Sequence, residues 1–338
     1  YEAKPHVGTD ILKDVVKNIR KQIIALGGEV RFSSKLEYIK SKDGKIRSII
    51  VNGEEIPCDA LVLALGHSSR DTYEMLNDIG IFMEPKAFAI GVRIEHPQEM
   101  INVGQYGKMT SHPRLQAASY NLTYQSKSLG RGIYSFCMCP GGVVVAAASE
   151  ENRLVSNGMS YHARDKENSN SALVVTVAPD DFEGNSVLRG MEFQRYYEGL
   201  AYKVGGGGYK APVQLLGDFI NDRRSTKLGG VTPSYEPGFE FADMRQCLPS
   251  YVVDAIKEGV GNFDRKIKGY GREDAILTGI ETRTSAPVKI TRNERLESIS
   301  LSGLYPCGEG AGFAGGIVSA AVDGIKVAER IIEKYYYS

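Results

Sequence analysis

Apolar residues near the start of the chain recur at helical spacing. After Thr9-Asp10, a pair suited to a helix N-cap, they return every three or four positions as far as Leu26. Gly27-Gly28 should end this helix, and the following residues 29–32 have the composition of a strand. The pattern therefore predicts a helix over about 9–26 and a short strand after it.

The next segment alternates as a β-meander. Residues 36–39 and 46–51 have the pattern of two hairpin arms around Asp43-Gly44. The nearly continuous apolar run 59–65 is typical of a strand buried on both faces, and a helix is expected over 71–80. A meander followed by a buried strand and a glycine turn matches the second half of an FAD-type Rossmann domain.

The middle of the chain is rich in strand patterns between residues 88 and 176, which predicts an antiparallel sheet or small barrel. Residues 192–203 and 249–259 have helical patterns, and the four glycines at 205–208 indicate a turn or hinge. The expected fold class is α/β with an α+β insert, a partial FAD/NAD(P)-binding Rossmann-type domain interrupted by an antiparallel β-rich domain. The expected boundaries are 1–85 for the nucleotide domain, 86–285 for the insert and 286–338 for the returning strand and helix.

Composition narrows the classes of function. Acidic and basic residues number 41 each in 338 residues, which argues against nucleic-acid binding. No apolar run is long enough for a membrane span and no signal peptide is evident, so we expect a cytoplasmic protein that does not bind membranes. The five cysteines are expected to be reduced, and their spacing does not suggest zinc. Because the chain starts at Tyr1 rather than Met, we expect a fragment of a longer protein.

The richest chemical signal is the glycine-dense stretch 303–317. An apolar strand runs into a Gly-Glu-Gly turn, which opens a helix of small residues from about Gly316 to Glu333. The stretch also contains a G-x-G-x-x-G, but the chain ends soon after the helix, without the further strand and acidic residue of a dinucleotide fingerprint. The arrangement instead resembles the closing motif of two-dinucleotide-fold flavoproteins, in which the helix N-terminus faces the flavin. The candidate flavin contacts are Gly308, Glu309, Gly310, Gly312, Gly315, Gly316 and Ile317; the alternative is a tight turn before a packed helix.

Several phrases spread over the chain resemble one family. They are residues 4–10 (KPHVGTD), 63–68 (LALGHS), 88–96 (FAIGVRIEH), 134–142 (YSFCMCPGG), 157–160 (NGMS), 281–287 (ETRTSAP) and 307–312 (CGEGAG). The chain resembles the bacterial FAD-dependent dehydrogenase family, whose members begin with a strand, a G-x-G-x-x-G turn and a helix that hold the FAD pyrophosphate. It is similar to the C-terminal two thirds of such proteins.

The resemblance implies FAD as the cofactor, and the family's naming suggests NAD(P) as a second one. By the same resemblance, Gly66 and His67 occupy the second flavin-fold motif, and the backbone at Val30 reads the adenine edge. His67 has an alternative role as a hydrogen-bonded cap at the strand end.

Three residues are candidates for catalysis. Cys137 and Cys139 are two apart in a predicted strand, so they should share a face and could form a redox pair or supply a nucleophile. The alternative is two small buried apolar residues. The resemblance brings Arg283 near the flavin, where it could hold an anionic substrate group; the alternative is a structural salt bridge with Glu281 or a neighbour. Four further residues are candidates for a substrate cavity or for ordinary surface and core: Arg93, His96, Tyr161 and His162.

The function expected from these signals is an FAD-dependent oxidoreductase that transfers hydride between flavin N5 and an unidentified small-molecule substrate. One alternative is a flavin-dependent reductase or saturase of a hydrophobic substrate. The other is a non-catalytic binding or regulatory module with a vestigial flavin fold. The oligomeric state is not indicated by the sequence.

Overall fold

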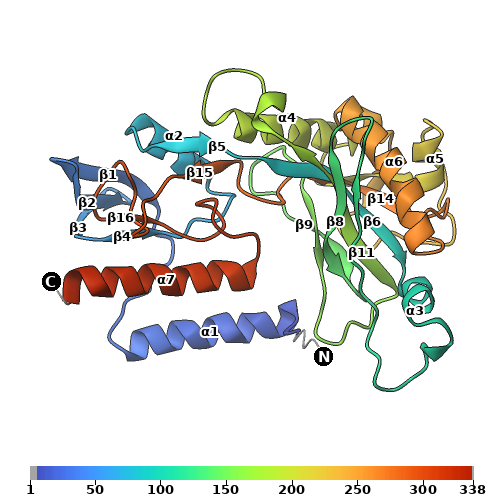
Figure 1. The fold of residues 1–338 in the computed structure, drawn as a ribbon, viewed down its shortest axis with the longest axis horizontal. Coiled ribbons are helices and arrows are strands. Elements are labelled where there is room, and N and C mark those ends of the chain that lie inside the picture. Colours follow the sequence, from blue (N-terminus) through green and yellow to red (C-terminus); the bar gives the residue numbers. More distant parts are fainter. Residues whose placement is uncertain (1–5, 337–338) are drawn as a thin grey trace. The chain divides into compact units, whose positions relative to one another are not determined.

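The computed structural model describes residues 6–336, and it shows a mixed α/β protein with several separate sheets (Figure 1). Its contacts divide the chain into two compact units. Unit 1 comprises the residues up to 30, 89–176 and 195–282; unit 2 comprises 31–88, 177–194 and the residues from 283 onward. Each unit is therefore assembled from three separate stretches of the chain.

Every helix predicted from apolar spacing is present. The helix predicted over 249–259 continues to Lys266, and the ends of the others differ by at most three residues. The α-helices are α1 (Thr9–Ala25), α2 (Arg70–Asp78), α3 (Gln98–Tyr106), α4 (Arg189–Val204), α5 (Leu216–Ile220), α6 (Ser250–Lys266) and α7 (Ile317–Tyr336). Short 3-10 helices are η1 (Gly107–Met109), η2 (Pro179–Asp181) and η3 (Met244–Gln246). Within the described part of the chain, none of these helices combines the length and the apolar character that crossing a membrane requires.

Unit 1 is organised around an open seven-stranded sheet with the order β13-β12-β14-β6-β11-β8-β7. The strands are β6 (Phe88–Pro97), β7 (Thr123–Gln125), β8 (Gly132–Cys139), β11 (Asn168–Val177), β12 (Ala211–Leu215), β13 (Phe239–Phe241) and β14 (Ile276–Glu281). A separate antiparallel pair is formed by β9 (Val143–Ala146) and β10 (Ser156–Met159). Of the two architectures predicted for this region, the structure shows the sheet, in which β12 pairs in parallel with β13 and the pairs β12–β14, β14–β6, β11–β8 and β7–β8 are antiparallel.

Helix α6 packs closely against this sheet. Its buried residues recur at helical spacing and include Val252, Ile256, Val260 and Phe263. A Cβ placed on Gly259 would lie 2.6 Å from Cγ2 of Ile133 in β8. Glycine at this position therefore allows the helix to approach the strand.

We expect Gly259→Ala to lower the free energy of unfolding by about 1–3 kcal/mol, because the added methyl group overpacks the contact with Ile133. Gly261→Ala is the matched control: Gly261 lies in the same helix, and a Cβ there would have no heavy atom within 4 Å. Alanine at 261 should raise stability by up to about 1 kcal/mol through helix propensity. Urea unfolding followed by circular dichroism measures both variants, and an equal loss in the two would contradict the packing argument.

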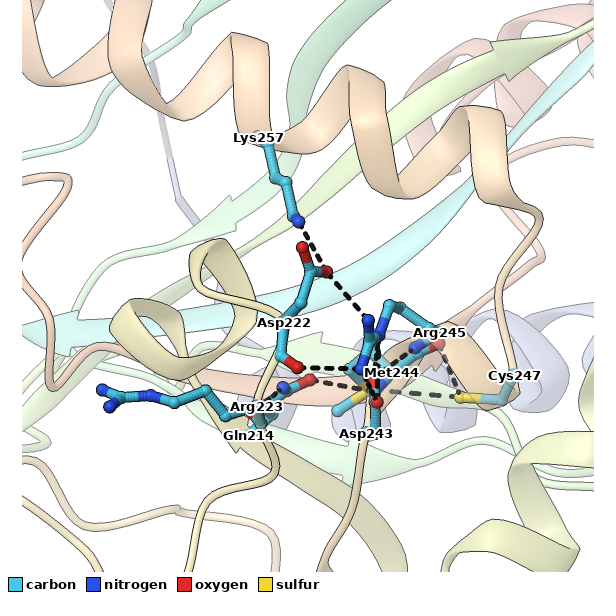
Figure 2. Close-up of polar contacts among 8 residues, drawn as sticks. All are labelled: Gln214, Asp222, Arg223, Asp243, Met244, Arg245, Cys247 and Lys257. Atoms are coloured by element: carbon cyan, nitrogen blue, oxygen red, sulfur yellow. Dashed lines mark hydrogen bonds and ion pairs between the residues drawn. The ribbon is translucent and has the colours of Figure 1, made fainter.

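Ion pairs on the surface of unit 1 connect the segment after α5 to η3 and α6 (Figure 2). Asp222 Oδ1 lies 2.7 Å from Lys257 Nζ and 3.3 Å from Arg245 Nη1. Arg245 in turn hydrogen-bonds Asp243, which lowers the pKa of that carboxyl. Because Asp222 and Arg245 are exposed, the two ion pairs of Asp222 should each contribute no more than about 1 kcal/mol.

A buried amide beneath these pairs fixes the same segments to the sheet. Gln214 of β12 accepts a hydrogen bond from the backbone N–H of Met244 at 2.9 Å and donates one to the carbonyl of Arg223 at 2.7 Å (Figure 2). Nearby, Cys247 is fully buried, and burial raises the pKa of its thiol to about 12. The cluster therefore has a structural explanation in the folding of this loop region.

Unit 2 holds three small sheets. Strands β1 (Leu36–Lys42), β2 (Lys45–Val51) and β3 (Glu54–Pro57) form an antiparallel meander; β4 (Leu61–Leu63) pairs in parallel with β16 (Leu304–Pro306), and β5 (Met83–Pro85) pairs antiparallel with β15 (Val288–Ile290). The predicted hairpin is confirmed: Asp43 and Gly44 both have positive φ, as a tight hairpin turn requires. A second such turn at Asn52-Gly53 adds β3, which we did not predict although Asn-Gly is a strong hairpin signal.

Two strand predictions are wrong. Residues 29–32 form no strand, because no neighbouring strand in the described residues pairs with them, and Val30 therefore lies in irregular chain. The run 59–65 yields only the three-residue strand β4, and Val62 is 42% exposed rather than buried on both faces. A parallel strand is buried on both faces only where helices cover both sides of the sheet, and that covering is absent at Val62 among the described residues.

Candidate functional site

Two turns of unit 2 follow parallel strands. Leu63 of β4 lies opposite Pro306 of β16, and its carbonyl accepts a hydrogen bond from Cys307 N at 2.9 Å. Because the two strands run in the same direction, the turns after them, 64–69 and 307–316, leave from the same edge. The carboxyl edge of parallel strands is where open α/β sheets bind ligands. The structure thus brings together the two glycine motifs that the sequence separates by about 240 positions.

The two turns touch through their glycine backbones. A Cβ on Gly310 would lie only 2.5 Å from the carbonyl oxygen of Gly66. The hydroxyl of Tyr73, on α2, donates to Gly310 O at 2.7 Å, with Gly66 O at 3.1 Å. Tyr73 is fully buried, and burial raises its pKa well above the usual range, so it stays a neutral donor. Tyr73 therefore fixes the spacing of the two turns.

A histidine and a carboxylate join the same turns. Glu309 Oε2 accepts the backbone N–H of His67 at 2.9 Å and lies 2.8 Å from His67 Nδ1. Because a carboxylate only accepts hydrogen bonds, Nδ1 carries a proton here. The other oxygen, Glu309 Oε1, is buried without a hydrogen-bond partner among the described residues. An acceptor held in this way is suited to a polar group of a ligand.

The N-terminus of α7 follows directly. Ile317 and Val318 are 69% and 76% exposed, and a Cβ on Gly315 would have no heavy atom within 4 Å. Gly316 N donates to Ser319 Oγ at 3.1 Å, which caps the first turn. The open end of this 20-residue helix presents partial positive charge to its surroundings.

Further along α7, Asp323 anchors the turn. Its Oδ2 accepts the N–H of Gly308 at 2.8 Å, and Arg292 pairs with both of its oxygens at 2.7 and 2.9 Å. Arg292 lowers the pKa of Asp323, so the carboxylate is charged at neutral pH. Gly312 packs tightly as well: a Cβ there would lie 2.9 Å from Lys289 Cα, and its φ is +88°. Gly308, whose φ is +76°, and Gly312 thus have structural reasons to be glycine.

Arg283 reaches the first turn. It is 5% exposed, and its Nη1 donates to Ser68 Oγ at 2.9 Å, directly after His67. Two residues on, Ser285 Oγ accepts a hydrogen bond from Lys86 Nζ at 2.5 Å. Burial lowers the pKa of Lys86, an effect that the charge of Glu309 opposes. Unit 2 therefore gathers two cationic side chains along the segment 283–287.

Other candidates lie in unit 1. Val30 belongs to that unit, whereas the two glycine turns belong to unit 2. Cys137 has φ +44° at an irregularity where β8 pairs with β11, which interrupts the expected alternation: Cys137 is exposed and Cys139 buried. Both are free thiols, and burial raises the pKa of Cys139. Protonated thiols are poor nucleophiles, which weighs against the redox role.

The candidates for a substrate cavity are also in unit 1. Arg93 and His96 are fully buried, and His96 Nε2 lies 2.7 Å from the carbonyl of Tyr270. Burial lowers the pKa of His96 to about 4, so the ring is neutral. His162 lies near the start of α1, where its N–H donates to Asp10. These contacts are those of core and capping residues.

Residues of the candidate site that escaped the sequence interpretation include Tyr73, Lys86 and Asp323. Tyr73 and Asp323 sit inside helices, where polar groups are usually ordinary surface positions. Lys86 follows a three-residue strand with no motif around it. A signal existed only for Tyr73, an aromatic residue with a polar tip on the helix that follows the Gly66 turn.

Comparisons with known proteins give the family. Residues 87–284, more than half of the chain, match the model of the family described as FAD-dependent protein, C-terminal domain-like. An uncharacterized protein of Clostridium beijerinckii is 73% identical over 335 residues, which are 99% of this chain and 63% of that protein. The chain thus spans less than two thirds of that relative's length. The chain is also similar to a solved oxidoreductase from Methanosarcina mazei. That alignment covers 94% of this chain and 54% of the oxidoreductase chain, with a TM-score of 0.38 and 13% sequence identity. The family match shows that the chain belongs to the FAD-dependent protein, C-terminal domain-like family.

Proposed function

We propose that this protein acts within an FAD-dependent oxidoreductase and that the two turns of unit 2 contact the flavin. In this proposal, unit 2 is part of a Rossmann-type nucleotide domain and the β-rich unit 1 is its substrate domain, as in the dehydrogenase family that the sequence resembles. The observation that carries the proposal is the buried Oε1 of Glu309, which has no hydrogen-bond partner within residues 6–336 and lies next to the contact of Gly66 with Gly310. The family description, which names FAD-dependent proteins, supports the same cofactor.

The residues present fit such a cofactor. A carboxylate oxygen without a partner can accept a hydroxyl or ring N–H, and the open N-terminus of α7 suits an electron-rich ring edge. Bound flavin would supply hydride transfer, for which NAD(P) is a candidate co-substrate. The chain's own contribution is placement: Tyr73 spaces the turns, His67 orients Glu309, and Asp323 holds Gly308.

The test is flavin retention. This chain and the longer Clostridium relative would each be incubated with FAD, desalted and scanned for the oxidised-flavin absorbance near about 450 nm. We expect bound flavin in the longer protein, because the third of its length that does not align with this chain should add contacts to the FAD pyrophosphate. Glu309→Ala, made at the equivalent position there, should reduce retention by about tenfold or more, the loss expected for a buried hydrogen bond to a charged group.

The exposed Glu329 of α7 provides the control, because Glu329→Ala removes the same charge without touching the turns. Melting temperatures of both variants separate lost binding from lost folding. Absence of flavin from both wild-type proteins overturns the proposal. Equal retention in the Glu309 and Glu329 variants would remove Glu309 from the site.

A further inference from the structure

The positive charge of Lys86 has little compensation from negatively charged groups nearby. Its Nζ donates to Ser285 Oγ at 2.5 Å, and its backbone N–H donates to the carbonyl of Pro287 at 2.9 Å. Among the residues that the structure describes, no carboxylate lies within 4 Å of this ammonium group. Glu309 acts on it only through space, and one oxygen of Glu309 is already bonded to His67. The half-buried ammonium therefore faces a neutral hydroxyl.

Lys86 and Ser285 have several hydrogen-bond donors that are available to a ligand. An ammonium has three N–H donors, and Lys86 uses one on Ser285. Because Ser285 Oγ accepts that bond, its own hydrogen is left to donate to another group. The two side chains together thus offer further donors and one net positive charge, at half-buried positions.

The backbone fixes this pair in place. Lys86 follows β5, whose partner β15 begins directly after Pro287, so the strand pairing places Lys86 opposite Pro287, two residues from Ser285. Arg283, on the same segment, is tied to Ser68 beside the His67–Glu309 pair. The Lys86–Ser285 pair therefore belongs to the same unit as the turns assigned to the cofactor.

We propose that Lys86 and Ser285 bind a carboxylate group of the substrate. A carboxylate carries one negative charge and two acceptor oxygens, which match one ammonium and one hydroxyl. A phosphate monoester carries a charge of nearly −2 and would leave an excess of negative charge close to Glu309. The assignment of this group to the substrate rests on the proposed function, whereas the anion site itself does not.

The test measures the reactivity of Lys86 in this chain without flavin. Reductive methylation with isotopically labelled formaldehyde, read by peptide mass spectrometry at a fixed mildly alkaline pH, reports the fraction of free amine at each lysine. Benzoate serves as the carboxylate probe. We expect saturating benzoate to slow methylation of Lys86 by about tenfold, the change that a rise of one unit in the pKa of Lys86 produces. The exposed Lys326 of α7 should react at an unchanged rate.

Two further arms make the outcome decisive. Ser285→Ala, with its melting temperature checked, should abolish the protection of Lys86, and persistent protection would remove Ser285 from the site. Inorganic phosphate replaces benzoate in the second arm, and protection by phosphate alone overturns the carboxylate assignment. Equal methylation of Lys86 with and without benzoate overturns the site altogether. Since no flavin is present, a failure of flavin binding leaves this readout unaffected.

Discussion

Gly310→Ala is expected to lower the free energy of unfolding by roughly 2–4 kcal/mol, because the new methyl group meets backbone rather than a movable side chain. Oxygen, carbon and nitrogen of Gly66 all lie within 2.6 Å of the position that the new Cβ would occupy. Separating the turns also lengthens the hydrogen bond from Tyr73 to Gly310 O. Hydrogen exchange of peptides covering 61–73 and 304–316, read by mass spectrometry, should show faster exchange in both turns together.

Gly315→Ala is the matched control for stability. It changes a glycine of the same turn, but a Cβ there would have no heavy atom within 4 Å. Its effect should stay within about 0.5 kcal/mol. Faster exchange confined to residues 304–316 in the Gly310 variant, with 61–73 unchanged, would contradict the coupling of the turns.

Arg93→Leu is expected to lower the free energy of unfolding of unit 1 by about 3–5 kcal/mol, the range for removing one partner of a buried ion pair. Arg93 is fully buried; its Nη1 lies 3.7 Å from Glu281 Oε2, and its other nitrogens donate to Asn170 Oδ1 and the carbonyl of Cys137. Removing the guanidinium takes a positive charge and hydrogen-bond donors away from the side chains of Glu281 and Asn170, which are 2% and 0% exposed. Thermal and urea unfolding measure the loss.

Arg223→Leu provides the comparison, because the Arg223 side chain is 67% exposed and lies 3.0 Å from Asp218. Arg223→Leu should lower the free energy of unfolding by less than about 1 kcal/mol. The double variant Arg93→Leu with Glu281→Leu should recover part of the stability, since apolar replacement of both partners avoids an uncompensated buried charge. If Arg93→Leu costs no more than Arg223→Leu, the ion pair does not stabilise the core.

Much of the element order could be predicted because periodicity is a local property. Apolar spacing indicated α1 and α6, and the alternating segments around Asp43-Gly44 indicated the hairpin. The prediction for 29–32 failed because a strand needs a neighbour to pair with, and composition does not show whether one exists. The expectation that the two cysteines share a face failed because a single residue at positive φ, Cys137, breaks the alternation of β8.

Some residues of the candidate site could likewise be predicted from the sequence, and others could not. Its glycines could be found because dense glycine is visible in the sequence, and His67 and Glu309 are adjacent to them. Tyr73 and Lys86 could not, because each acts through a partner distant in the chain: Tyr73 through Gly310, and Lys86 through Ser285. Contacts over such separations depend on the pairing of β4 with β16 and of β5 with β15, which a single sequence does not reveal.

Each unit contains a buried thiol that can report its own opening. Cys247 of unit 1 is fully buried, and Cys307 of unit 2 is 3% exposed; burial raises their pKa values to about 12 and about 11. Alkylation requires both access and a thiolate, and the folded chain withholds both at neutral pH. Modification of either sulfur therefore records a moment when its surroundings were open. One chain thus carries two independent reporters of local unfolding, with no label added.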